Sequence, residues 1–355
     1  MEYVSKGLTV EKALQISGLT KHQYYYKKSE SQKRGRKPSK ETIYIINGNK
    51  YMHSNAKVVE KIKENHADFD LQYGYQRMTT YLNIMGYIIN HKKVYRLMNE
   101  NQLLRLKSVK KKKNYARYRI VIPSQPLELL EMDIKLVWIE SKRTHAYILT
   151  IIDVFTRTVL EWHVAMSITQ HTVKDVFTSV IVNHLQEHDL LAKGVHIEIR
   201  NDNDKRFSAL MVQQFFEQNF LNQVFTHPYT PQENGHIESF HSILGRSLDR
   251  HNFFTLSQLE EYLTIFYEKY NNQRLHGSIA NLPPTVFWEQ WNLGNIQRTV
   301  YDNKKVKFKL LIPYNQISGN VNLREVHRLN YHALDGQDNL LNLVKGAFTF
   351  YQPSV

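Results

Sequence analysis

Hydrophobic and polar residues follow two different patterns along the chain, and the change lies near residue 127. Before it, apolar residues recur at helical spacing over residues 9–28 and 73–103. After it, apolar and polar residues alternate as in half-buried strands over residues 128–140, 158–166 and 195–202. Helical patterns then cover residues 172–188, 208–219 and 255–273. We therefore expect helical N-terminal units followed by a sheet with helices packed on it.

The order of these segments sets the fold class. Residues 146–155 are almost continuously apolar, as in a strand buried on both faces, and residues 222–229 read as a short strand. Three strands, a helix, a strand, a helix, a strand and a helix predict an α/β fold with a mixed sheet. In the first strand, we expect Leu130, Met132, Ile134, Leu136 and Trp138 to face one way and Asp133 and Lys135 the other.

Residues 1–32 have the spacing of a helix-turn-helix. Thr9 can cap the first helix, and Thr20 with Gln23 forms a capping box for the second, after a break at Gly18. The candidate DNA-binding residues of the second helix are Lys21, His22 and Gln23. A helical hairpin with a solvated basic face fits equally well, and the pattern alone does not separate the two interpretations.

Residues 67–106 predict a second helix-turn-helix. Gly86 ends one helix, and Asn90 can cap the next. The second helix carries Lys92, Lys93 and Arg96 on one side and Val94, Leu97 and Met98 on the other. Apolar residues inside and cations outside favour DNA binding over a plain packing unit.

The charge is concentrated in the first third of the chain. The net charge is +14, but residues 1–126 contain 26 Lys and Arg against 9 Asp and Glu, whereas the remainder contains 21 against 24. Such a block indicates a polyanionic partner. We favour nucleic acid over an acidic membrane surface, because no amphipathic basic helix with an exposed aromatic face stands out.

Two basic tracts connect the expected units. Arg34 and Arg36 could lie in a minor groove, although a plain charged linker is the favoured interpretation of residues 33–40. In the tract 105–119, we expect an extended segment along DNA phosphates. Its candidate contacts are Lys110, Lys111, Lys112 and Lys113.

Composition excludes some classes of protein. The chain has no cysteine, so disulfides and thiolate zinc sites are excluded. It has no apolar signal segment and no run of 18 apolar residues, so we expect a soluble, cytoplasmic protein.

Three acids form the candidate catalytic and metal-binding site: Asp133 within a strand, Asp202 at the end of another, and Glu238 near the start of a helix. Glu238 borders the apolar stripe of Ile237, Phe240, Leu244 and Leu248, so we expect it to lean toward the sheet. Any one such acid is more often a solvated or salt-bridged residue. Together, in a strongly basic chain, they favour a magnesium site, because magnesium prefers oxygen ligands and uses few carboxylates.

Several stretches resemble the DDE-type bacterial insertion-sequence transposases, whose catalytic core is similar to that of retroviral integrases. The most specific is PYTPQENGHIESF (228–240), and the resemblance covers roughly residues 70–290. The other stretches are EMDI, LTIIDVFTRTVLEW, YGYQRMTTYL and YEKYNNQRLHGSIANLPPTVFW. Two positions depart from the family: Asp204 follows Asn203 where glycine is usual, and Gly245 stands where a cation is usual, with Arg246 next.

The resemblance implies a ribonuclease H-like core in which Asp133, Asp202 and Glu238 hold two Mg²⁺ or Mn²⁺ ions, with Asp204 as a possible substitute ligand. It implies a transposase that binds terminal inverted repeats, then cleaves and joins double-stranded DNA, as a dimer or tetramer at the bacterial nucleoid. Asn234, His236 and Arg246 would contact DNA near the site, whereas Asp153 and Glu233 would be structural. An inactive DNA-binding regulator and a nuclease that only hydrolyses are the rival interpretations.

The expected domain boundaries follow from these patterns. They are a helix-turn-helix (1–32), a basic linker and helix (33–66), a second helix-turn-helix (67–106), a basic linker (107–126), the ribonuclease H-like core (127–295) and a small β-rich domain (296–355). The last could bind DNA or cap the fold.

Overall fold

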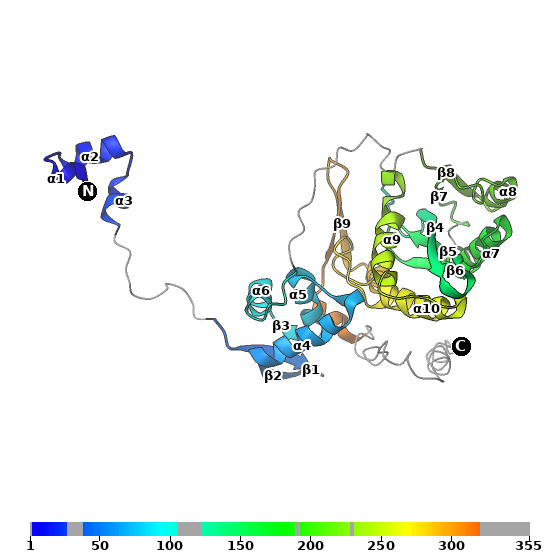
Figure 1. Cartoon of the computed structure of the whole chain (residues 1–355), viewed down its shortest axis with the longest axis horizontal. Coiled ribbons are helices and arrows are strands. Elements are labelled where there is room, and N and C mark those ends of the chain that lie inside the picture. Colours follow the sequence, from blue (N-terminus) through cyan, green and yellow to red (C-terminus); the bar gives the residue numbers. More distant parts are fainter. Residues whose placement is uncertain are drawn as a thin grey trace. The chain divides into compact units, whose positions relative to one another are not determined.

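A computed structural model describes residues 2–26, 38–105, 122–188, 190, 192–227 and 231–319 (Figure 1). The chain divides into two compact units, Met1–Lys40 and Glu41–Val355. Within the described ranges, no helix is both long enough and apolar enough to cross a membrane.

The first unit contains three short helices, α1 (Glu2–Ser5), α2 (Val10–Ser17) and α3 (Lys21–Tyr25). The Thr9 side chain accepts a hydrogen bond from the Lys12 amide at the start of α2, and Gly18 ends this helix with a φ of 66°. Thr20 and Gln23 form the capping box of α3. The predicted helix, turn and helix are therefore confirmed, with both caps.

The second unit opens with a β-hairpin that the sequence interpretation missed. Strands β1 (Glu41–Ile46) and β2 (Asn49–Ser54) pair antiparallel around Asn47 and Gly48, which have φ angles of 50° and 77°. Two positive φ angles at an Asn-Gly pair are typical of a two-residue hairpin turn. The prediction of only a basic linker and a helix over residues 33–66 is wrong in this part.

Three helices pack beside this hairpin: α4 (Asn55–Ala67), α5 (Tyr75–Ile84) and α6 (His91–Glu100). The short strand β3 (Tyr87–Ile88) joins β1 between α5 and α6, and the 3₁₀ turn η1 (Phe69–Leu71) follows α4. Gly86 has a φ of 98° and lies against the Ile45 carbonyl, so a side chain here would be strained and would meet backbone. The Asn90 side chain caps α6, as predicted.

A five-stranded sheet forms the centre of the second unit. Its strands are β4 (Leu129–Ile139), β5 (Thr144–Asp153), β6 (Val159–Ala165), β7 (Ile197–Asn201) and β8 (Leu221–Phe225), with η2 (Glu140–Lys142) after β4. Their order is β6-β5-β4-β7-β8. The first three strands pair antiparallel, whereas β7 and β8 run parallel to β4. The expected mixed sheet and α/β class are confirmed.

Helices cover both faces of this sheet (Figure 1). On one face, α7 (Gln170–Val180), its π-helical extension η3 (Ile181–Gln186) and α8 (Leu210–Gln218) pack on Leu130 and Met132. On the other, α9 (Gly235–Leu248), which follows η4 (Pro231–Asn234), and α10 (Leu256–Asn272) pack on Val137 and Ile139.

The expected apolar row of β4 is correct only for its first half. Leu130 and Met132 are buried, but Leu136 and Trp138 are 51% and 44% exposed. In this half of β4, Val137 and Ile139 are the buried residues, because α9 and α10 cover the opposite face.

The described chain ends in α11 (Pro284–Asn292), the hairpin β9 (Ile296–Val300) and β10 (Val306–Leu310), and η5 (Tyr314–Gly319). Phe308 of β10 contacts Phe155 and Phe287, in the same core cluster as α4, α5 and α6. β9 and β10 are strands of the segment predicted to be β-rich (296–355), whereas its residues 320–355 lie outside the described residues. The linker predicted at 107–126 also falls mostly outside them.

Candidate active site

Two of the three predicted acids belong to neighbouring parallel strands, Asp133 within β4 and Asp202 directly after β7. Glu131 of β4 pairs with Arg200 of β7 in the last pair between these strands, and the same register continued by two residues would set Asp133 level with Asp202. Residues level with each other on adjacent strands point to the same face and are separated by about 4.8 Å. The charge of Asp133 contributes to the raised pKa of Asp202, which agrees with two carboxylates that lie close together.

Helix α9 runs along β4 in the same direction. A Glu131 carboxylate oxygen accepts the backbone N–H groups of His236 and Ile237 at 3.0 and 2.7 Å. Two strand residues further on, Asp133 Oδ2 lies 3.2 Å from His241 Nδ1. Four helical residues rise about 6 Å and two strand residues about 6.7 Å, so helix and strand advance almost in step.

Glu238 lies on α9 between these two contacts. It is three residues before His241, and residues at this spacing are neighbours on one side of a helix. Glu238 is exposed, so the expectation that it leans toward the sheet and away from water is wrong. The apolar stripe next to it is buried as predicted, in Ile237, Phe240, Leu244 and Leu248.

The surroundings of Asp202 disfavour its charged form. Loss of solvation raises the pKa of this carboxyl even though its side chain still reaches water, and the nearby charges of Asp133 and Asp204 raise it further. The Asp204 N–H, donated at 3.1 Å, and Arg206 act in the opposite direction. A cation placed between Asp133 and Asp202 would relieve this repulsion.

Asp204 has a partner of its own. Its carboxylate accepts from the Arg206 guanidinium at 2.8 and 2.5 Å, and this bonding lowers the pKa of Asp204. An aspartate held by both oxygens is a poor substitute ligand, so the geometry does not favour that role.

The chemistry of these acids fits a hard divalent cation. In the described part of the chain, no group of three or more His, Asp or Glu side chains forms a closed metal-binding cluster. Magnesium, however, is usually held by one or two carboxylates together with substrate phosphate and water. Asp133 and Asp202 provide two carboxylates, whereas Glu238 is an exposed residue of the first turns of α9.

Sequence reasoning missed two residues of this region, Glu131 and His241. The His241 ring contacts Asp133 and is almost buried, and its spacing of three residues from Glu238 is a signal that could have been noticed. Burial raises the pKa of Glu131 to about 7, opposed by the Ile237 N–H and by Arg157 and Arg200. No local pattern marks Glu131 as the residue that holds α9.

Asp153 and Glu233 have the structural surroundings that were expected. Asp153 is buried and accepts the backbone N–H groups of Leu127, Phe155 and Thr156. Glu233 is buried and accepts the His227 N–H at 2.9 Å.

Three predicted DNA contacts lie near the ends of α9. Asn234 is buried just before the first turn of α9. Burial, and to a lesser extent the charges of Arg157 and Arg200, lower the pKa of His236 to about 3. His236 is thus neutral at pH 7 and is poorly suited to contact phosphate. Arg246 is exposed, and its Nε donates to the Ser242 carbonyl.

The other predicted DNA contacts lie on the two helical segments. Lys21, His22 and Gln23 are exposed on α3, but the Gln23 amide oxygen is occupied by the cap. On α6, Lys92 is exposed, Lys93 donates to the Glu41 carbonyl, and Arg96 pairs with Glu100. Arg34, Arg36, Lys110, Lys111, Lys112 and Lys113 lie outside the described residues.

Comparison with protein families agrees with this arrangement. Two models described as integrase core domain match residues 123–231 and 220–284. Together they cover β4 to β8, α9 and α10, and therefore all three acids. We call residues 123–284, which these two models match, the integrase core domain. A model described as HTH-like domain matches residues 53–113, which include α4, α5 and α6.

Proteins of bacterial insertion elements are similar to more than half of this chain. The transposase of insertion sequence element IS904 from Lactococcus lactis is 26% identical over 247 residues, which are 66% of this chain and 93% of the relative. A 39.2 kDa protein of insertion element IS476 from Xanthomonas euvesicatoria is 27% identical over 218 residues, which are 61% of this chain. The match spans 60% of that relative's own length.

Solved structures with some similarity to this chain include the catalytic core of BIV integrase and the Mos1 transposase catalytic domain with raltegravir and magnesium. The first is 18% identical and covers 47% of this chain and 97% of its own, with a TM-score of 0.34. The second is 11% identical and covers 40% of this chain and 71% of its own, with a TM-score of 0.35.

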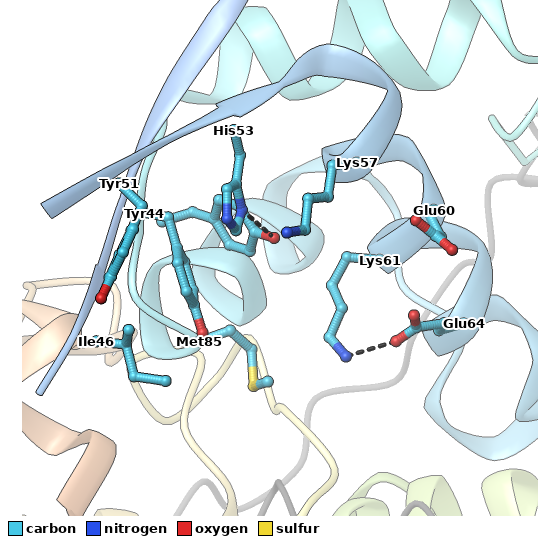
Figure 2. A pocket seen from close by; sticks show the side chains of 10 residues that line it. Tyr44, Ile46, Tyr51, His53, Lys57, Glu60, Lys61, Glu64 and Met85 are labelled. Carbon is cyan, nitrogen blue, oxygen red and sulfur yellow. Dashed lines mark hydrogen bonds and ion pairs between the residues drawn. The ribbon is translucent and has the colours of Figure 1, made fainter.

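A separate hollow of about 620 Å³ lies outside the integrase core domain, between β1, β2 and α4 (Figure 2). The rings of Tyr44 and His53 stack there with centroids 4.5 Å apart, and Lys61 pairs with Glu64. His53 Nδ1 lies 3.1 Å from the Tyr87 hydroxyl. Of these contacts, that of His53 with Tyr87 joins the hairpin to β3, and none of the three acids lines this hollow.

Proposed function

We propose that the protein is a DNA transposase that binds the terminal inverted repeats of its element, cleaves DNA there and joins the freed ends to target DNA. The observation that carries this proposal is the proximity of Asp133 on β4 and Asp202 after β7, two parallel neighbouring strands, since the charge of Asp133 helps to raise the pKa of Asp202. Glu238 would complete the site from α9. The integrase core domain match and the similarity to insertion-element proteins support the same reaction class.

Asp133, Asp202 and Glu238 would hold two Mg²⁺ or Mn²⁺ ions. When bound, such ions neutralise the charge of a reacting phosphodiester and favour ionisation of the attacking hydroxyl. His241 contacts Asp133 and would fix the direction in which that carboxylate points. Glu131 would hold the first turn of α9, and with it Glu238, at the level of the two aspartates.

The reaction needs no covalent enzyme intermediate. In the first step, the oxygen of water bonds to phosphorus, the bond from phosphorus to the 3′ oxygen breaks, and a 3′-OH and a 5′-phosphate remain. In the second step, that 3′ oxygen loses its proton and bonds to a target phosphorus, while the target 3′ oxygen leaves and takes up a proton. One phosphodiester replaces another, so positioning and charge neutralisation supply most of the catalysis.

The partners would be double-stranded transposon ends and target DNA. The helices α3 and α6 would lie in grooves or along the backbone, and the excess of Lys and Arg in the first third would bind phosphates. Because two ends must be joined to one target, we propose a homo-oligomer, a dimer or tetramer, acting on DNA at the bacterial nucleoid.

A joining assay tests this function. Labelled duplexes taken from the DNA that flanks the coding sequence are incubated with the full chain, a target plasmid and Mg²⁺, and we expect both cleaved and joined products. Glu238→Gln should lower product formation at least about a thousandfold while leaving duplex binding unchanged. Glu217→Gln, which changes an exposed glutamate on α8, is the matched control and should keep full activity.

Two outcomes would replace the proposal with a rival. Cleaved products without joined ones would indicate a nuclease that only hydrolyses. Specific binding of the ends without any cleavage in Mg²⁺ or Mn²⁺ would indicate a DNA-binding regulator.

A further inference from the structure

Lys135 lies two residues after Asp133 on β4 and crosses α9 at Gly245. A Cβ atom added to Gly245 would lie 3.2 Å from Lys135 Nζ and 3.5 Å from Lys135 Cε. Alternation along the strand puts Lys135 on the same face as Asp133. The end of this lysine therefore rests in a notch on the helix that also carries Glu238.

The glycine that makes this notch is not required by the backbone. Gly245 is inside α9 and does not have a positive φ. A glycine inside a helix destabilises it by about 1 kcal/mol relative to alanine. In the described part of the chain, the only atoms that a Cβ at this position would meet belong to Lys135. Glycine therefore leaves room for the end of the lysine side chain.

Among the residues that the structure describes, the Lys135 ammonium group has no hydrogen-bond acceptor and no ion-pair partner, although the side chain is only partly exposed. The nearest acid along the strand, Asp133, is in contact with His241 instead. A partly buried ammonium group has three N–H donors and is normally paired with an anion, so a ligand would have to supply that anion.

We propose that Lys135 binds a backbone phosphate of the DNA strand that lies over Asp133 and Asp202, and that the Gly245 notch positions its ammonium group for this contact. Two strand residues span about 6.7 Å, and successive phosphates of one strand advance about 3.4 Å along the duplex. Lys135 thus reaches a phosphate one or two nucleotides from the one facing Asp133. The inference rests on the proposed function, since it assumes that DNA lies over Asp133 and Asp202.

Binding of a duplex with an already exposed 3′-OH end tests Lys135 without requiring catalysis. Lys135→Gln should weaken binding about tenfold, the usual effect of losing a charge-assisted hydrogen bond. It should also reduce the slope of log K against log salt by about 0.9, the value for one phosphate contact. The control Lys142→Gln removes an exposed lysine at the far end of β4 and should change neither quantity.

Gly245→Leu tests the notch with the lysine still present. Leucine favours helix more than glycine does, so thermal stability should not fall, yet the filled notch displaces the ammonium group and binding should weaken severalfold. The double variant should bind no more weakly than Lys135→Gln alone, because no ammonium group remains to be displaced.

Two results would overturn the inference: an unchanged salt slope in Lys135→Gln, or additive losses in the double variant. If the wild type binds with the full slope but produces no cleaved or joined DNA, the proposed transposase function fails while the Lys135 contact stands.

Discussion

At the scale of single residues, the candidate site combines groups with opposing electrostatic effects. Loss of solvation and the charge of Asp133 raise the pKa of Asp202. Asp133 itself has a basic neighbour, His241. The sequence indicated which acids to consider, because Asp133 and Asp202 fall on strand patterns. It could not indicate His241, since its contact depends on the distance between α9 and β4.

Buried histidines give the molecule a testable dependence on pH. Burial, together with the charges of Arg274, Arg77 and Arg157, holds the pKa of His276 well below 6.5. Such a group contributes stability that is present above pH 6.5 and is lost as the pH falls, by up to about 1.4 kcal/mol per pH unit. In urea unfolding at pH 7.5 and 5.0, the wild type should lose about 2 kcal/mol more than His276→Asn. Equal losses would show that His276 does not remain neutral in the folded protein.

At the scale of elements, α9 is held by a side chain from the sheet. Asn234 at its start makes no side-chain cap, and Glu131 accepts the first amides instead. Helix α9 could be predicted from its apolar stripe, but the residue that caps it is more than a hundred positions earlier in the chain. The β1–β2 hairpin, by contrast, could have been recognised from Asn47-Gly48.

Removing the Glu131 carboxylate should affect both stability and catalysis. Glu131→Ala leaves two buried N–H groups without an acceptor and should lower the free energy of unfolding by about 1–3 kcal/mol. Glu131→Gln keeps an oxygen acceptor and should lose less. If Glu131 positions Glu238, the Glu131→Ala variant should also need more Mg²⁺ to reach half-maximal joining. A loss of stability with an unchanged Mg²⁺ requirement would mean that the role of Glu131 is structural only.

At the scale of the whole molecule, the HTH-like domain and the integrase core domain share direct contacts. The Tyr73 hydroxyl donates to the Gln273 carbonyl and accepts the Leu275 N–H, and Lys269 pairs with Asp68 at 2.6 Å. Hydrophobic periodicity revealed the elements on both sides but not these contacts, because each joins residues about 200 positions apart. The half-exposed row of Leu136 and Trp138 was misjudged for a similar reason, since which face is covered depends on α9 and α10.

The uneven charge of the whole chain predicts a strong effect of salt on DNA binding. If the basic first third makes six to ten phosphate contacts, affinity should fall about 10³- to 10⁵-fold between 50 and 200 mM salt. Titration of a labelled duplex at several salt concentrations measures this slope. A change of less than about tenfold would indicate that the basic segments are not the main DNA-binding surface.

The central claim is that Asp133, Asp202 and Glu238 together bind divalent cations. Anomalous diffraction from crystals of the full chain grown with an end duplex and Mn²⁺ tests it most directly. We predict manganese peaks within ligand distance of the Asp133 and Asp202 carboxylates, with Glu238 at a second peak, and their loss in Asp202→Asn. Manganese bound elsewhere, or bound unchanged in Asp202→Asn, would contradict the assignment of this site.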